Sequence, residues 1–174
     1  MKVANVVIIV DLLKTPLDLD KIHKKIKNTE FTTLASRWLK MRLMPENLYV
    51  AFYRSGKFSV TGIKKIEDID LIVERILFKL KEIGIEIEKV DIKITTMTFM
   101  ETMELSRNLD SIISNLDPHK ASYEIELFPG LIYKDWKSVF LLFNSGKVII
   151  VGPKSQEEAE MSFKMFKNLI ENIK

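Results

Sequence analysis

The chain carries one motif twice, and this duplication limits the folds that it can adopt. The stretch FYRSGK at Phe52–Lys57 recurs 90 positions later (52 to 142) as LFNSGK at Leu142–Lys147. The glycine and lysine that follow the first copy recur at the same offset, as Gly62 and Lys64 and then as Gly152 and Lys154. The sequence therefore predicts two similar halves, residues 1–88 and 89–174, related by a pseudo-twofold axis.

Hydrophobic periodicity changes in the same order in both halves. In the first half we expect a strand at 3–11, a helix at 17–28 capped by Asp18 or Asp20, strands within 30–42, at 48–53 and at 57–62, and a helix at 67–84. In the second half we expect a strand at 90–98, a helix at about 104–115, strands within 121–152 and a helix from 155. Both halves thus have the predicted order β-α-β-β-β-β-α. The expected apolar side of the helix at 67–84 is Ile69, Leu71, Ile72, Ile76, Leu77 and Leu80.

The junction between the halves, at 84–88, is too short to be a linker. We therefore expect an α+β fold in which both halves share one antiparallel sheet with helices on one side. Strands 48–53 and 147–151 carry apolar residues on both faces, as strands do when both sides of a sheet are covered. If helices cover only one side, the other side is an apolar surface rimmed by lysines, and such a surface indicates a binding site.

Composition narrows the class of protein without fixing its function. The chain has 174 residues, 47% hydrophobic and 29% charged, which is typical of a folded domain. The longest apolar runs, such as Val6–Val10, are far too short to cross a bilayer, and no cysteine is present for disulfides, thiolate zinc sites or a cysteine nucleophile. We expect a protein of the cell interior. A net charge of +3 means that nucleic-acid affinity would depend on where the cations lie.

One long segment of the second half resembles a known family. The sequence YEIELFPGLIYK at Tyr123–Lys134, followed by LLFNSGKVIIVGPK at Leu141–Lys154, is similar to the second repeat of the TATA-box-binding protein family, archaeal type. The order of elements, the repeat offset and the length also match. The resemblance implies a saddle of two pseudo-twofold repeats, with one curved antiparallel sheet and helices on the convex side. It implies minor-groove binding to A·T-rich promoter DNA, which family members kink with aromatic wedges, side chains inserted between base pairs.

The resemblance assigns DNA-contact roles to individual residues. Phe128 and Phe143 match the wedge pair of the second repeat, whereas in the first repeat Tyr53 and Ser36 occupy the wedge positions, with Leu34 and Trp38 as candidate substitutes for Ser36. The other implied base-contact residues are Asn5, Val7, Thr61, Thr96 and Val151, where Thr96 replaces an asparagine of the family. Because half of this paired set departs from the family pattern, we expect weaker or less TATA-selective binding than in a standard member.

Cations and carboxylates extend the implied interface. Six cations stand at matching places in the two repeats and are expected to contact phosphates: Arg42, Lys57, Lys64, Lys134, Lys147 and Lys154. A solvated lysine face is the alternative for any one of them. Glu124 and Glu126 resemble the family's docking site for transcription factor B. The alternative is that both are ordinary surface glutamates.

Three functions stay open on the sequence. The first is a transcription initiation factor that binds and bends promoter DNA, recruits transcription factor B and, indirectly, RNA polymerase, and resides in the cytoplasm at the nucleoid. The second is a divergent paralogue that acts as a regulatory protein-interaction module. The third is a substrate-binding domain of a nucleic-acid enzyme. No sequence context pairs His23 or His119 with a nucleophile or with a cluster of metal ligands, so we expect no enzymatic activity and no cofactor. Without DNA, the uncovered face favours a homodimer.

Overall fold

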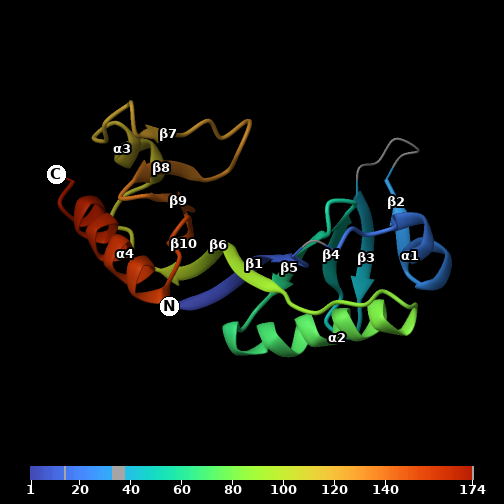
Figure 1. Cartoon of the computed structure of the whole chain (residues 1–174). Coiled ribbons are helices and arrows are strands. Elements are labelled where there is room, and N and C mark those ends of the chain that lie inside the picture. The colour runs from blue at the N-terminus through green and yellow to red at the C-terminus, as the bar shows by residue number, and fades with distance from the viewer. Residues whose placement is uncertain (14, 33–37, 174) are drawn as a thin grey trace. The chain divides into compact units, whose positions relative to one another are not determined.

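The secondary structure follows one order twice along the chain. The computed structural model describes residues 1–13, 15–32 and 38–173. The first series of elements, labelled in Figure 1, is β1 (Lys2–Asp11), α1 (Leu19–Lys25), β2 (Thr29–Phe31), β3 (Trp38–Leu43), β4 (Leu48–Tyr53), β5 (Lys57–Ile63), a 3-10 turn (Ile66–Asp68) and α2 (Ile69–Glu82). The second series is β6 (Asp91–Thr102), α3 (Leu109–Ile113), β7 (Ala121–Ser122), β8 (Leu131–Asp135), β9 (Ser138–Leu142), β10 (Lys147–Val151) and α4 (Gln156–Glu171). The predicted order β-α-β-β-β-β-α is confirmed in both series. Among the described helices, none has the length and apolar character that a membrane span requires.

The strands form one sheet in the order β2-β3-β4-β5-β1-β6-β10-β9-β8-β7. Successive strands β2 to β5 and β7 to β10 pair as antiparallel neighbours, and β1 and β6 pair with β5 and β10 in the same way. The prediction of an α+β fold built on an antiparallel sheet is confirmed.

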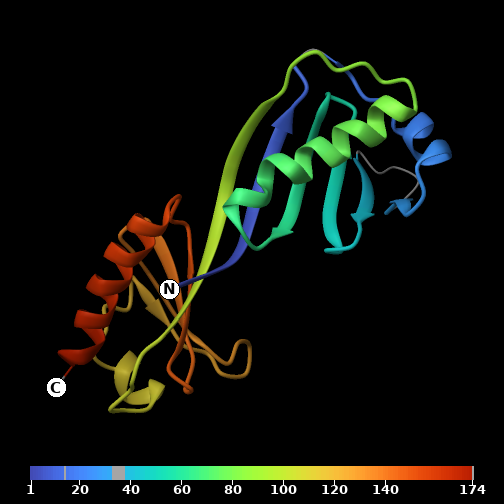
Figure 2. The same ribbon diagram turned by 90° about the horizontal axis from the view of Figure 1, so that it is seen from below.

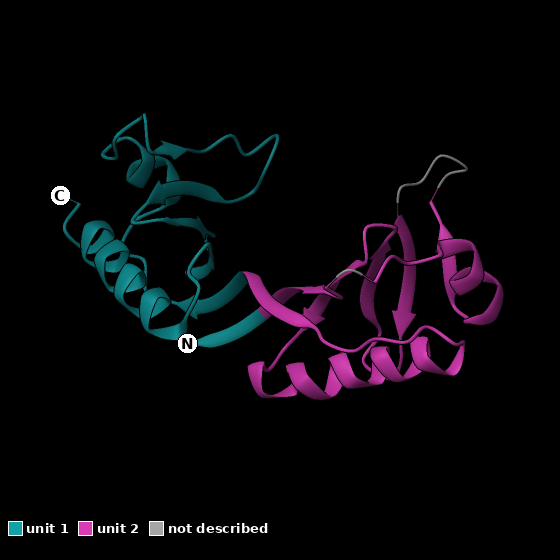
Figure 3. Ribbon diagram, viewed as in Figure 1, with its two compact units in different colours: residues 1–4, 96–174 teal, residues 5–95 magenta. Residues whose placement is uncertain are grey.

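The chain forms two compact units, shown in Figure 3. Unit 2 comprises residues 5–95, and unit 1 comprises residues 1–4 and 96–174. Strands β1 and β6 each contribute residues to both units. Inside unit 2, the hydroxyl of Thr95 on β6 donates a hydrogen bond of 3.1 Å to the carbonyl of Val7 on β1. The units are described separately below.

In unit 2, the helix α2 lies across one face of the strands (Figure 2). Strand β1 turns Val6, Ile8 and Val10 toward the helix, and all three are fully buried because alternate side chains of a strand point to the same face. The helix buries Ile69, Ile72, Val73, Ile76 and Leu80. Leu71 was expected on this side but is 59% exposed, because the buried stripe follows the i, i+3, i+4, i+7 pattern and Leu71 falls outside it.

Local caps delimit the two helices of unit 2. The carboxylate of Asp18 accepts hydrogen bonds from the backbone amides of Asp20 and Lys21, so the cap predicted at Asp18 or Asp20 is at Asp18. Helix α1 ends at Lys25, before the expected end at 28. Just past α2, Gly84 has a φ of 76°, a conformation that glycine adopts without a steric penalty and that commonly ends helices.

In unit 1, the helix α4 lies across one face of the strands (Figure 2). It packs on β8 and β9 through aromatic rings. Phe166 of α4 stacks on Phe140 of β9 with ring centroids 4.4 Å apart and planes within 7°. Tyr133 of β8 also contacts both rings. The hydroxyl of Ser155 caps α4 by accepting a hydrogen bond from the amide of Glu158. The predicted start of this helix is confirmed.

The first strand and helix of the second series differ from their predicted bounds. Strand β6 continues to Thr102 instead of ending at 98, because residues 98–102 pair with β10 over its whole length. The amide of Met103 then donates to the carbonyl of Gly146, which holds the backbone to the β9–β10 turn and delays the helix. Helix α3 is therefore only Leu109–Ile113, with Asn108 as its cap.

Candidate functional site

Each unit has a sheet face that its own helices leave uncovered, and the strand register places the side chains on it in rows. In unit 2, one row across β1, β5, β4 and β3 is Val7, Thr61, Tyr49 and Arg42, and the next is Ile9, Ser59, Ala51 and Lys40. In unit 1, the rows across β6, β10, β9 and β8 are Thr98, Val151, Val139 and Lys134, and Met100, Ile149, Leu141 and Ile132. Apart from Ala51, these side chains are half-buried or exposed.

The two open faces differ in chemistry. Strands β8, β9 and β10 present aliphatic side chains, so the expected apolar surface exists in unit 1. In unit 2 the open face mixes Val7, Ile9 and Ala51 with Ser59, Thr61, Tyr49 and Lys40, so the expected apolar surface is only partly present there. The difference comes from residue type, because the strands of the two units pair in the same register. In unit 2 the large hydrophobic residues of β4 and β5 point to the helix side.

Phe128 and Phe143 lie together at one end of the open face of unit 1. Their ring centroids are 5.7 Å apart, with planes inclined by 64°. Both rings are half-buried and neither belongs to the core beneath α4. Gly130 lies under them, and a Cβ atom there would be 2.7 Å from Cε1 of Phe128 and 3.1 Å from Cε1 of Phe143. The lack of a side chain at Gly130 makes room for the ring pair.

The matching place in unit 2 has a different aromatic pair. Trp38 stands directly opposite Tyr53 in the β3–β4 ladder, and its side chain is 38% exposed. Trp38 occupies the position that Gly130 has in unit 1. The next residues, Leu39 and Leu131, pair with Phe52 and Leu142, which begin the two copies of the repeated motif. Ser36 and Leu34, the other residues considered for the first wedge, lie outside the described residues.

Asn5 is oriented by a hydrogen bond inside unit 2. Its Oδ1 atom accepts 2.8 Å from the backbone amide of Gly62, next to Thr61 on β5. Because the oxygen takes this bond, the Nδ2 group is the end that can donate to an acceptor above the sheet. In unit 1, the residue compared with Asn5 is Thr96, half-buried on β6, which offers a shorter side chain with a single donor.

Ion pairs distinguish the cations of the two open faces. In unit 2, Lys57 Nζ lies 3.0 Å from a carboxylate oxygen of Asp11, and Lys40 Nζ lies 2.9 Å from one of Glu30. The hydrogen bond from Lys57 holds the pKa of Asp11 below its ordinary value, and the amide of Leu13 adds to this effect. The residue opposite Lys147 on β6 is Thr102, so no carboxylate faces this lysine from the neighbouring strand.

The remaining predicted cations are exposed. Arg42 extends over the ring of Tyr49, with its guanidinium carbon 5.3 Å from the ring centroid. Lys64 follows β5, Lys134 lies on β8, and Lys154 precedes α4. Lys134 and Lys154 form no ion pair with the described residues, which leaves their charges available to an anionic partner.

Glu124 and Glu126 lie in a tight turn. The sequence predicts strand from 121 onward, but β7 ends at Ser122, because the amides of Leu127 and Phe128 both donate 2.9 Å bonds to the carbonyl of Glu124. Both glutamates are exposed. Sequence reasoning missed their neighbours Ile125 and Leu127, which are 63% and 81% exposed. The alternation of acidic and apolar residues in the sequence EIEL, residues 124–127, was the signal that could have identified these two exposed apolar side chains.

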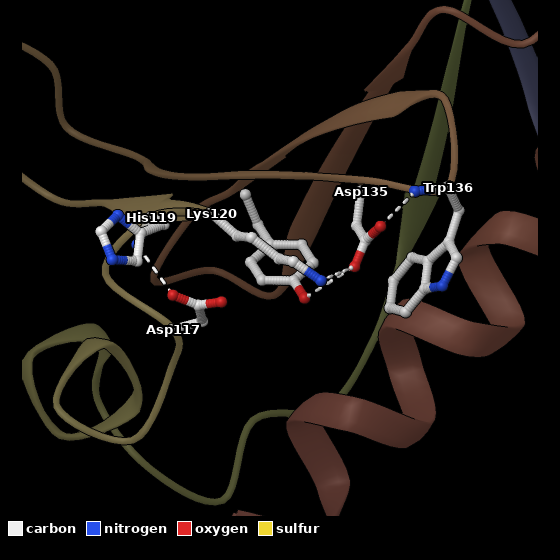
Figure 4. A network of polar contacts seen from close by, with 6 residues as sticks. Asp117, His119, Lys120, Asp135 and Trp136 are labelled. Carbon is white, nitrogen blue, oxygen red and sulfur yellow. Dashed lines mark hydrogen bonds and ion pairs between the residues drawn. The ribbon is translucent and has the colours of Figure 1, made fainter.

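A polar network fixes the hairpin that carries Lys134 (Figure 4). Lys120 Nζ lies 2.7 Å from Oδ2 of Asp135, which the Tyr133 hydroxyl also approaches at 3.4 Å, while the amide of Trp136 donates to Oδ1. The hydrogen bond from Lys120 lowers the pKa of Asp135, and the same contact raises the pKa of Lys120. Nearby, Asp117 accepts from the amide of His119. Within the described ranges, no three histidine or acidic side chains gather as a metal site would require.

The duplicated β-α-β-β-β-β-α order, with an uncovered sheet face in each unit, defines a class of repeat α+β proteins built on one antiparallel sheet. The family described as "Transcription factor TFIID (or TATA-binding protein, TBP)" matches residues 1–83 and 91–173. The chain belongs to this family of transcription factors.

Archaeal proteins of the same family are similar to the chain over nearly its whole length. The TATA-box-binding protein of Methanocaldococcus jannaschii is 34% identical over 176 residues, covering 99% of this chain and 94% of that protein. That of Pyrococcus abyssi is 35% identical over 162 residues, covering 91% and 83%. The solved structure of Methanococcus jannaschii TBP matches with a TM-score of 0.87 and 32% identity, covering 99% of this chain and 98% of that one. These likenesses confirm the predicted family and fold.

Proposed function

We propose that the chain is a transcription initiation factor that binds A·T-rich promoter DNA in the minor groove and bends it. The observation that carries the proposal is the pair of uncovered sheet faces, each with residues that suit a minor groove. A sheet reads that groove through its width, through apolar contacts and through a few hydrogen bonds. The donor of Asn5, oriented by Gly62, suits the adenine N3 and thymine O2 acceptors.

The aromatic pairs supply the bending step of the proposal. Phe128 and Phe143 stand at the end of one face, exposed enough to enter a base step, and Gly130 lets them act as one wedge. In the other unit, Tyr53 with Trp38 takes the wedge role that Ser36 cannot perform. Unstacking a step costs a few kcal/mol, which the larger contact with bent DNA offsets.

Phosphate contacts complete the DNA interface. We assign them to Arg42, Lys57, Lys64, Lys134, Lys147 and Lys154, with Val7, Thr61, Thr96 and Val151 facing the bases. Such cations strengthen binding without reading sequence and make it sensitive to salt. Lys57 contributes less than Lys147, because Asp11 already neutralises it.

The bound complex then recruits the transcription machinery. We assign the docking of transcription factor B to the turn that holds Glu124 and Glu126, with Ile125 and Leu127 as apolar anchors. RNA polymerase joins indirectly, through that factor.

The protein acts at the nucleoid in the cytoplasm and has no enzymatic role. Without DNA, a second copy covers the apolar face of unit 1. The two repeats, residues 1–88 and 89–174, are the proposed units of duplication.

A binding titration tests the proposal. A labelled A·T-rich duplex and a G·C-rich control are titrated at several salt concentrations, and energy transfer between the duplex ends reports bending. The proposal expects selective, salt-sensitive binding with an increase in transfer. Phe128→Ala and Phe143→Ala should reduce the bend more than the affinity. Weak binding that ignores sequence and leaves the duplex straight would overturn the proposal.

A regulatory paralogue is the second candidate, and one observation favours it. The open face of unit 2 carries the carboxylates of Asp11 and Glu30, each paired with a lysine that would otherwise attract phosphate. In this function the chain binds DNA weakly and acts by holding a protein partner. The same titration separates the candidates, since the paralogue would show no bend while still binding transcription factor B through Glu124 and Glu126.

A further inference from the structure

Hydroxyl groups stand on the open face of unit 2 where unit 1 has methyl groups. Thr61 and Ser59 on β5 match Val151 and Ile149 on β10, and Tyr49 on β4 matches Val139 on β9. The side chains of Ser59 and Thr61 are half-buried and have no hydrogen-bond partner in the part of the chain that the structure describes. These hydroxyls are therefore available to a ligand on the face.

On the first strand of each unit, β1 and β6, the difference is reversed, because here unit 1 has the hydroxyl group and unit 2 has the methyl groups. On β6, Thr98 begins the row that continues with Val151 and Val139, whereas on β1 the matching row begins with Val7. The contrast between hydroxyls and methyls is thus confined to β4 and β5 against β9 and β10. In the proposed DNA complex, in which β1 and β6 contact the centre of the element, the contrast concerns its outer base pairs.

Guanine differs from the other bases in the minor groove by one group. A G·C pair adds the N2 amino donor of guanine, whereas A·T pairs show only acceptors there. A valine or isoleucine pressed on that amino group buries it without a partner, which costs about 1–3 kcal/mol. A hydroxyl oxygen can accept from the amino group, and by rotating it can instead donate to adenine N3 or thymine O2. Hydroxyls thus accommodate both kinds of base pair.

We propose that unit 2 tolerates G·C pairs in the outer part of its half of the element, whereas unit 1 requires A·T pairs. The specificity-determining residues are Thr61 and Ser59, with Tyr49 beside them. The carboxylate of Asp11 at the end of β1 adds a further acceptor on the same face. The proposal rests on the proposed function, since it assumes that both open faces contact one minor groove.

Three duplexes test the proposal with the full chain. The first has A·T pairs throughout, the second has outer G·C pairs in one half, and the third has them in both halves. Because the protein can bind in either orientation, the second duplex lets unit 2 take the substituted half. We expect it to bind within about threefold of the first, and the third to bind about tenfold or more weaker than the second.

Exchanging residues between the units sharpens the test. Thr61→Val with Ser59→Ala removes the acceptors, and the ratio of affinities between the first and second duplexes should rise to about tenfold. Val151→Thr is the reciprocal change and should lower the ratio between the second and third duplexes. Reading ratios separates selectivity from any general loss of binding or folding.

A single label shows which unit takes which half. The chain contains no cysteine, so Ser55→Cys in the β4–β5 turn offers one site for a DNA-cleaving iron chelate. On the second duplex we expect cleavage beside the substituted half. If the second duplex loses as much affinity relative to the first as the third loses relative to the second, or if cleavage occurs beside the A·T half, the inference alone is overturned. Failure to bind the first duplex would instead contradict the proposed function.

Discussion

The rings of Phe128 and Phe143 meet edge to face, with centroids 5.7 Å apart, directly above Gly130. Edge-to-face contact is a favoured arrangement of aromatic rings, because the positive edge of one meets the negative face of the other. The pair therefore holds a defined position on the open face before any ligand arrives. A wedge that is already ordered loses less side-chain entropy on binding than a mobile one.

We first predict that Gly130→Ala disturbs the proposed wedge, the ring pair of Phe128 and Phe143, more than it disturbs the fold. The added Cβ would lie 2.7 Å from the edge of the Phe128 ring, and the ring must move because the contact atoms belong to side chains. We expect a loss of stability below about 1.5 kcal/mol, with a clearly smaller DNA bend. Energy transfer between duplex ends and thermal unfolding measure the two effects. A normal bend in the variant would contradict the role of the ring pair.

The contrasting variant Gly146→Ala should reduce the stability of the fold more than it disturbs the ring pair. Gly146 has a φ of 77°, and a Cβ there would lie 2.0 Å from the backbone carbonyl oxygen of Met103. Because this contact is with backbone, no side chain can move aside, so we expect a loss of about 2–4 kcal/mol. Denaturant unfolding measures it. A stable Gly146→Ala protein would show that the β9–β10 turn tolerates rearrangement.

A third prediction concerns the ion pair between Lys57 and Asp11. Asp11→Asn removes the carboxylate that neutralises Lys57, so the lysine becomes available to phosphate. We expect the affinity for A·T-rich DNA to rise about threefold to tenfold, and its dependence on salt to become steeper by about one phosphate contact. Titrations at several salt concentrations measure both quantities.

A matched control makes the charge change specific. Asp70→Asn removes the same charge from α2, on the other side of the sheet. An effect of bulk charge would appear in both variants, whereas an effect of Lys57 appears only with Asp11→Asn. Equal gains in the two variants would refute the prediction.

The fourth prediction is a pH dependence of unit 1. Asp135 has a lowered pKa, so its contact with Lys120 stabilises the folded state above an ordinary carboxyl pKa of about 4, and this stability is lost as pH falls through the lower folded value. Lys120 has a raised pKa, so its share is complete below about pH 10 and is lost as pH rises through the folded value. Asp135→Asn should flatten the acid side of this profile. Melting temperatures from pH 2 to pH 7 test it, and an unchanged acid slope would refute it.

The sequence predicted the fold well because its signals are local and duplicated. Alternation in β1 and the turn at Gly56 depend on neighbouring residues, and the repeat checks each assignment against a second copy. Helix α3 was predicted too long because the bond from Met103 to Gly146 joins residues far apart in sequence. The same limit applies to the site. The position of Lys57 was predictable, but its ion pair with Asp11 depends on the register between β1 and β5.

The last prediction concerns the turn at Glu124–Phe128. Glu124→Lys with Glu126→Lys reverses the charge of this turn, while Leu127→Ala removes its most exposed apolar side chain, 81% accessible. Both variants should retain DNA binding, because none of the residues proposed to contact phosphate changes. Both should lose transcription factor B from the DNA complex if the proposed docking role is right. A gel-shift assay with DNA and the factor measures both steps. Glu157→Lys with Glu160→Lys on α4 is the matched control, because it changes the same number of charges elsewhere on unit 1. If the control variant also lost the factor, the contact would depend on overall charge, and the assignment of the turn would be wrong.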